Sequence, residues 1–145
     1  MSESIAAILN DILRVDNIDE GFSCFLVHRS NAERDKINSW QQEMANVFKT
    51  TSTEQTEAAV RQILCVSATC APSRLQLLLE LVERLIRTGS LPPRLVCETI
   101  ITCDKLQHQN SDFWLECFAL LHRTIDMVEY KVRFIFFIQT VQLYQ

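Results

Sequence analysis

The chain has 145 residues, a hydrophobic fraction of 48% and a net charge of −4, so it can bury a core and is unlike a disordered segment. Its two glycines argue against phosphate-binding loops, dinucleotide-binding folds and hairpin-rich sheets, which need Gly at positive φ or against a ligand. The acidic balance argues against non-specific nucleic-acid binding, and the basic cluster of Arg84, Arg87 and Arg94 is interpreted mainly as a solvated helix face.

The first predicted element is an amphipathic helix that begins at about Ser2. Its apolar residues recur with helical spacing, and they are Ile5, Ile8, Leu9, Ile12 and Leu13. The start lacks the basic region and continuous apolar run of a signal peptide, and no stretch reaches the roughly 18 apolar residues that a membrane span needs. The six cysteines are therefore expected to be reduced thiols. A short apolar segment follows at 18–27.

Capping signals mark the next two helices. Ser30, with Glu33 three residues later, forms a capping-box pattern that predicts a helix to about Lys49. A break rich in Thr and Ser separates it from a helix predicted over 54–67. The residues predicted to face inward are Ile37, Trp40, Met44, Val47 and Phe48 in the first of these helices and Val60, Ile63 and Leu64 in the second.

Proline and glycine delimit the helices in the middle of the chain. Pro72 fits the first turn of a helix, and Gly89 lies where a left-handed residue would end it. The predicted inward face of this helix is Leu75, Leu78, Leu79, Val82, Leu85 and Ile86. Pro92 and Pro93 then reverse the chain and begin a further helix. Its predicted inward residues are Leu95, Val96, Thr99 and Ile100.

The last predicted helix begins at Asn110 or Ser111. Its predicted stripe is Trp114, Cys117, Phe118, Leu121, Ile125 and Val128. Phe113 is adjacent to Trp114, so both cannot face the core equally, and Phe113 is predicted to be an exposed anchor for a partner. Seven or so helices with short connections predict an all-α fold, in which antiparallel helix pairs stack as the start of a HEAT-like α-solenoid.

Cysteine spacing gives no support for a metal site. Structural zinc sites place two close cysteine pairs at C-x2–4-C spacing, whereas Cys65 and Cys70, five positions apart, are at its upper limit and Cys97 and Cys103, six apart, exceed it, so the chain lacks the two pairs. Cys117 and a histidine five residues later do not match a helical chelate either. We therefore predict no metal site and interpret the buried cysteines as small core residues.

Candidate catalytic residues are also few. His28, His108 and His122 lie in no recognisable nucleophile motif, and Glu80 and Glu83 are interpreted as solvated charges on a helix. We therefore predict no catalytic residue, no cofactor site and no small-molecule substrate, so the chain is predicted not to be an enzyme. A mode of action through protein binding is the interpretation that remains.

The segment 88–101, Thr-Gly-Ser-Leu-Pro-Pro-Arg-Leu-Val-Cys-Glu-Thr-Ile-Ile, carries a resemblance to a known family. It is similar to a Thr-Gly-x-Leu-Pro-Pro-Arg-Leu-Val-Cys-Glu segment near the N-terminus of the Mediator subunit 23 family. Trp114 and the run 128–131, Val-Glu-Tyr-Lys, add to it, and the opening helix matches more loosely. The resemblance covers about 1–131.

The resemblance implies a helical-repeat subunit of the Mediator tail module in the nucleus. Such a subunit is a non-catalytic coactivator that bridges activators to RNA polymerase II. Its implied partners are other tail-module subunits and transcription activators, without direct nucleic-acid, membrane or small-molecule binding. The alternative is a free-standing helical adaptor outside Mediator, and a groove with an exposed Phe113 would favour it.

The tail departs from the family pattern. We expect 1–131 to be the helical-repeat segment and 132–145 a divergent apolar tail, because the family's Gly after Tyr-Lys is absent here. The tail contains five consecutive apolar residues at 134–138, which one stripe of a helix cannot bury together. We interpret the tail as the mark of a truncated or alternatively spliced product.

Overall fold

The computed structural model describes residues 2–15, 30–70, 72–103 and 111–124. These residues form six α-helices, α1 (Ser2–Arg14), α2 (Asn31–Lys49), α3 (Thr53–Thr69), α4 (Pro72–Arg87), α5 (Pro93–Thr102) and α6 (Ser111–Arg123). No strand occurs in these four ranges, and the all-α prediction is confirmed. The segment predicted at 18–27, and Ile125 and Val128, lie outside the described residues.

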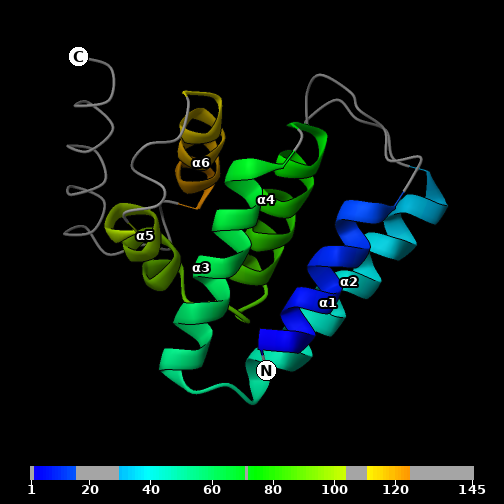
Figure 1. The fold of residues 1–145 in the computed structure, drawn as a ribbon, viewed down its shortest axis with the longest axis horizontal. Helices are drawn as coiled ribbons and strands as arrows, with labels where there is room; N and C mark the ends of the chain where they lie inside the picture. Colours follow the sequence, from blue (N-terminus) through cyan, green and yellow to red (C-terminus); the bar gives the residue numbers. More distant parts are fainter. Residues whose placement is uncertain (1, 16–29, 71, 104–110, 125–145) are drawn as a thin grey trace.

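The helices lie in two layers (Figure 1). α1 contacts α2 and α3, while α3 also contacts α4 and α5. In the other layer α4 contacts both α2 and α6. Thus α1, α3 and α5 form one layer and α2, α4 and α6 the other, with α4 flanked on both sides within its layer.

Side-chain caps explain where α2 and α3 begin. Ser30 Oγ accepts a hydrogen bond from the Glu33 amide at 3.2 Å, as the sequence pattern predicts for the start of α2. At α3 the capping box is complete, because Ser52 Oγ accepts from the Gln55 amide at 3.2 Å and Gln55 Oε1 accepts from the Ser52 amide at 3.0 Å. The Thr- and Ser-rich break therefore contains the N-cap of α3, in which Ser52 and Gln55 each accept from the other's amide, and α3 begins at Thr53.

The corner between α4 and α5 is a Schellman motif. Gly89 has φ +80°, its amide donates to the Ile86 carbonyl at 3.1 Å, and the Ser90 amide donates to the Leu85 carbonyl at 2.8 Å. These bonds satisfy carbonyls that the end of α4 would otherwise leave unpaired. Pro93 then occupies the first turn of α5, where its missing N–H costs nothing.

Replacing Gly89 by Ala should destabilise the chain by about 1 kcal/mol, because an L side chain is strained at positive φ. An added Cβ would meet no atom within 4 Å, so the loss is conformational rather than steric. Urea unfolding measures it. The matched variant Gly89→Asn should lose less, because Asn tolerates the left-handed region. Equal loss in both variants would contradict this explanation.

The core is larger around α4 than the sequence pattern predicts. All six residues of its predicted inward stripe are buried, and Leu77 and Leu81 are fully buried as well. A helix that meets the core on one face buries a single stripe, whereas α4 has α2 and α6 on its flanks and also contacts α3 in the other layer. The two additional leucines follow from this central position.

The orientation of α6 differs from the prediction. Phe113 is 1% exposed and packs edge-on against Trp114 with ring centroids 5.7 Å apart, whereas Phe118 is 37% exposed. The prediction that Phe113 is an exposed anchor is therefore wrong, and so is the inward placement of Phe118. The residues of α6 and its end that are buried are Phe113, Trp114, Cys117, Leu120, Leu121 and Thr124. Because α6 is apolar on nearly all sides, its own pattern does not determine which face turns inward.

Candidate protein-interaction surface

Two hydrogen bonds join α1 to other helices, one to α2 and one to α4. Trp40 Nε1 on α2 donates to Asp11 Oδ2 on α1 at 2.7 Å, which satisfies a nearly buried indole N–H. The Arg74 guanidinium, in the first turn of α4, donates to the backbone carbonyl of Val15 at the end of α1. A cation at this position also complements the negative end of the α1 dipole.

Arg84 connects α4 to α2. Its Nη1 atom donates to Asn38 Oδ1 at 3.3 Å and to Gln41 Oε1 at 3.4 Å, both on α2. Its Nη2 atom lies 3.3 Å from Glu80 Oε1 one turn earlier on α4. The side chain therefore links two helices of one layer and cannot be described as a solvated charge alone.

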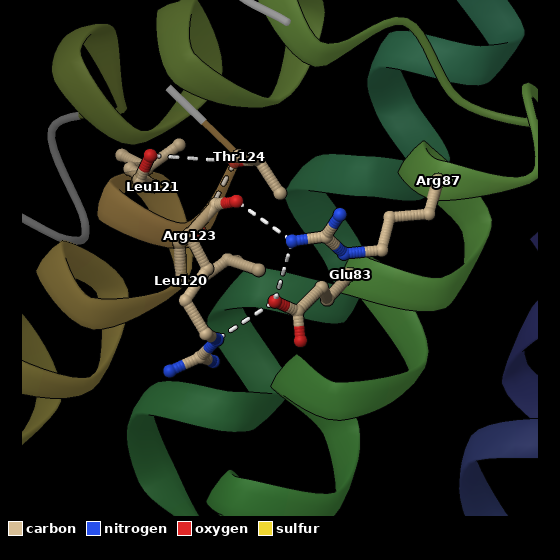
Figure 2. Close-up of polar contacts among 6 residues, drawn as sticks. All are labelled: Glu83, Arg87, Leu120, Leu121, Arg123 and Thr124. Atoms are coloured by element: carbon tan, nitrogen blue, oxygen red, sulfur yellow. Dashed lines mark hydrogen bonds and ion pairs between the residues drawn. The ribbon is translucent and has the colours of Figure 1, made fainter. Parts of the chain in front are cut away.

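Glu83 is the centre of the polar contact between α4 and the end of α6 (Figure 2). Its Oε1 atom accepts a hydrogen bond from Arg123 Nε at 2.7 Å and lies 3.7 Å from Arg87 Nη2. The same Arg87 nitrogen donates to the backbone carbonyl of Arg123 at 2.7 Å. The interpretation of Glu83 as a solvated charge is wrong, because its side chain is only 17% exposed.

This contact, which we call the Glu83 node (Glu83, Arg87 and Arg123), also satisfies the end of α6. Arg87 occupies a terminal carbonyl of that helix, and the buried Thr124 hydroxyl donates to the Leu120 carbonyl at 3.0 Å (Figure 2). No local pattern identifies the node, because Arg123 lies 40 residues from Glu83 in sequence. It fixes the position of α6 against α4.

The basic cluster is paired with acidic residues on the same helices. Arg84 pairs with Glu80 and Arg87 with Glu83, while Arg94 Nε lies 2.9 Å from Glu98 Oε1 on α5. Nucleic-acid binding requires cations that are free to neutralise phosphates. Arg84 and Arg87 also bond to α2 and to the end of α6, so the interpretation of a mainly solvated face does not describe these two residues. The absence of nucleic-acid binding stays a prediction.

The outer face of α6 carries exposed apolar side chains. We define it as Leu115, Phe118, Ala119 and His122, which recur at i, i+3, i+4 and i+7. Leu115 is 48% exposed and Phe118 37% exposed. The His122 ring stacks on Phe118, with centroids 6.2 Å apart and planes 22° apart. This face points away from the buried side of α6 and could contact another helix.

Two shallow grooves lie on the other side of the molecule, along α1. One, of about 570 Å³, lies between α1 and α2 and includes the carboxylates of Asp11 and Glu43. The other, of about 270 Å³, lies between Ile5 of α1 and the small side chains of Ala58 and Ala59 on α3. Neither of these two grooves is lined by a His or Cys.

The candidate ligands and nucleophiles do not gather at one place. The cysteines that the structure describes are thiols at separate positions of the fold, namely Cys65, Cys70, Cys97, Cys103 and Cys117. In the part of the chain that the structure describes, no three His, Cys, Asp or Glu side chains are placed to hold a metal ion. His122 is exposed on α6, while His28 and His108 lie outside the described residues. Absence of a metal site and of catalysis remain predictions.

Two buried thiols give the stability of the fold a pH dependence. Burial, with a smaller contribution from Glu98, raises the pKa of Cys97 from 9.0 to about 12, and burial likewise raises the pKa of Cys117. Above pH 9 the unfolded chain therefore loses thiol protons that the folded chain keeps. Because the unfolded state then binds fewer protons, the free energy of unfolding should fall by about 1.4 kcal/mol per pH unit for each such thiol.

Urea unfolding of the wild type and of Cys97→Ala between pH 6 and pH 11 measures this effect. The difference in unfolding free energy between the two proteins should be constant up to about pH 8 and shrink above pH 9, as the wild type alone loses the Cys97 contribution. A difference that stays constant to pH 11 would show that the Cys97 thiol is not protected by the fold.

The chain is similar in sequence to proteins of one known family. A family model described as Mediator complex subunit 23 matches residues 1–143. Two curated proteins named "Mediator of RNA polymerase II transcription subunit 23", from Drosophila melanogaster and Homo sapiens, are each 26% identical over 131 and 132 residues, or 90% of this chain. Their namesake from Aedes aegypti is 36% identical over 88 residues, which is 60% of this chain and 6% of its own length.

The match covers a small part of these relatives. The chain spans about a tenth of the length of the curated relatives it matches, 9% for the Drosophila protein and 10% for the human one. The family match also extends to residue 143, beyond the boundary predicted at 131, and that boundary stays a prediction. Among the helices that the structure describes, none combines the length and apolarity needed to cross a membrane.

Proposed function

Because the chain belongs to the Mediator complex subunit 23 family, we propose that it is a non-catalytic scaffold segment of a transcription coactivator. It acts by binding proteins along its helix faces. Its partners are other subunits of the Mediator tail module and transcription activators, and it contributes to bridging activators to RNA polymerase II in the nucleus. The observation that carries this proposal is the family match over residues 1–143.

The use of polar side chains in the fold supports a scaffold role. Asp11 accepts from Trp40, and Glu83 accepts from Arg123, so these carboxylates join helices. Arg84 likewise spans from α4 to α2. Groups that bond to a neighbouring helix in this way have a structural role within the fold, which supports the proposal of a scaffold.

We also propose that the six described helices form three repeats of a HEAT-like α-solenoid. The pairs α1/α2, α3/α4 and α5/α6 stack so that each helix contacts its counterpart in the next pair, α1 with α3, α3 with α5, α2 with α4 and α4 with α6. Stacking of each helix on its counterpart in the next pair is typical of a solenoid. Such a stack offers extended faces for protein partners.

The free-standing adaptor is less well supported. Its expected mark is an exposed Phe113 in a groove, whereas Phe113 is buried between α6 and the core. None of the described surfaces favours a partner outside Mediator over one within it. The family assignment therefore supports a partner within Mediator over one outside it.

Affinity purification of the tagged chain from nuclear extract, followed by quantitative mass spectrometry, tests the proposal. Mediator tail subunits and activators should be enriched with the folded chain. The control is Phe113→Asp, which places a charge in the core and should unfold the helices, so that it reports capture by exposed apolar surface alone. Equal recovery of Mediator subunits with both proteins, or no recovery with a chain shown by circular dichroism to be folded, would refute the proposal.

A further inference from the structure

The larger of the two grooves, which we call the α1–α2 groove, is lined by residues of α1 and α2, and these helices lie side by side at one end of the molecule (Figure 1). Its six lining residues are Ala7, Ile8, Asp11, Glu43, Asn46 and Val47. Three of them are apolar, two are acidic and none is basic. A groove that combines apolar and acidic side chains with no cation of its own is complementary to a cationic, amphipathic partner.

The two carboxylates of the groove have acceptor capacity left for such a partner. Glu43 is exposed and makes no hydrogen bond or ion pair within the residues that the structure describes. Asp11 is also exposed, and its Oδ2 atom accepts from Trp40 Nε1 at 2.7 Å, which leaves the other carboxylate oxygen for a second donor. The bond to Trp40 holds the Asp11 side chain in place, so a partner that binds it has one side chain fewer to order.

The spacing of the carboxylates matches the repeat of an α-helix. Asp11 is bonded to Trp40, and Glu43 lies three residues after Trp40, about 4.5 Å further along the axis of α2. Basic residues three or four positions apart on a partner helix lie on one face, about 5–6 Å from each other. Ala7 and Val47, which line the same groove, offer small apolar side chains that allow this face to approach closely.

We propose that the α1–α2 groove docks an amphipathic helix of a partner protein, which presents two Lys or Arg residues three or four positions apart beside apolar residues. Charge argues against other occupants, because a second copy of the chain carries a net charge of −4 and nucleic acids and anionic membranes present phosphates. A small cationic molecule would bury little of its surface in a shallow groove. The inference names the chemistry of one partner, and it rests on the protein-binding mode of action proposed above.

An NMR titration of the intact, 15N-labelled chain with a synthetic probe tests this docking. The probe is a 16-residue alanine-based helix with two arginines four positions apart and a leucine three positions after each, so that all four share one face. Its addition to about 1 mM should shift the amide signals of the residues that line the groove. A twin with glutamate in place of both arginines should bind at least about tenfold more weakly. Raising NaCl from about 50 mM to about 500 mM should weaken binding of the arginine probe.

Substitution of Glu43 tests the charge directly. Glu43→Lys should weaken binding of the arginine probe about tenfold and Glu43→Gln about threefold, because lysine repels the partner's cation whereas glutamine only removes an attraction. The matched control Glu54→Lys makes the same charge change at an exposed position of α3 outside the groove, and should alter the affinity by less than about twofold. Circular dichroism should show that all three variants are folded, since both positions are exposed.

Four results would overturn the inference: no binding of the arginine probe at about 1 mM, equal binding of its glutamate twin, equal loss of affinity with Glu54→Lys, or shifts confined to other helices. The proposed function fails separately. Absence of Mediator subunits from the purification described above would refute that function and leave a positive titration unaffected. A negative titration would overturn the docking inference alone, because the other helix faces remain for those partners.

Discussion

Replacing Phe113 by Ala is expected to destabilise the folded chain by about 3–5 kcal/mol, the range for deleting a buried phenyl ring. Phe113 is 1% exposed and its ring is in edge-on contact with Trp114, so the substitution removes apolar burial and leaves a cavity that the surrounding helices fill only in part. Thermal unfolding should show a fall in melting temperature of roughly 10 °C. Trp fluorescence should shift to longer wavelength as Trp114 gains contact with water.

The matched control is Phe118→Ala on the same helix. Phe118 loses the same atoms but is 37% exposed, so its replacement should cost about 1 kcal/mol or less. Comparison of the two losses of stability shows which face of α6 is turned inward. A larger loss from Phe118→Ala than from Phe113→Ala would contradict the observed orientation and restore the one predicted from the sequence.

The second large effect is expected at the Glu83 node. Glu83→Gln should lower the free energy of unfolding by about 2 kcal/mol, because Arg123, with 22% of its side chain exposed, loses its ionic partner at 2.7 Å. The loss is smaller than for a fully buried pair, since solvent still reaches both groups. Hydrogen exchange should also accelerate at the end of α6, whose position Arg87 and Arg123 fix through this carboxylate.

An exposed ion pair on α3 provides the control. Arg61 and Glu57 are 3.2 Å apart with about half of each side chain exposed, so Glu57→Gln should change stability by no more than about 0.5 kcal/mol. A double-mutant cycle between Glu83→Gln and Arg123→Ala should give a coupling energy of about 1–2 kcal/mol. Additive effects of the two substitutions would mean that the node does not hold α6 to α4.

The ends of the helices could be predicted because local chemistry determines them. Ser30 caps α2 through a hydroxyl three residues from its donor, and α2 ends at Lys49 as predicted. Gly89 ends α4 because only glycine adopts positive φ without strain, and Pro93 begins α5 for an equally local reason. Each of these signals lies within a few residues of the feature that it predicts.

The arrangement of side chains around α4 and α6 could not be predicted in the same way. The sequence pattern gives one inward stripe per helix, but α4 has three neighbours and also buries Leu77 and Leu81. For α6, apolar residues on both sides left two orientations open, and contact with α4 selected the one that buries Phe113. The Glu83 node likewise depends on Arg123, which lies 40 residues away in sequence. Sequence spacing does not predict that these two residues are close in space.

The central position of α4 has a consequence for synthesis of the chain on the ribosome. α2 and α3 precede α4 and can pack on it as soon as it emerges, whereas α6 follows it. At translation rates of about 5–20 residues per second, the 36 residues from Arg87 to Arg123 require roughly 2–7 s. During that interval one flank of α4 faces water, and the nascent chain is then most exposed to premature association and to capture by chaperones.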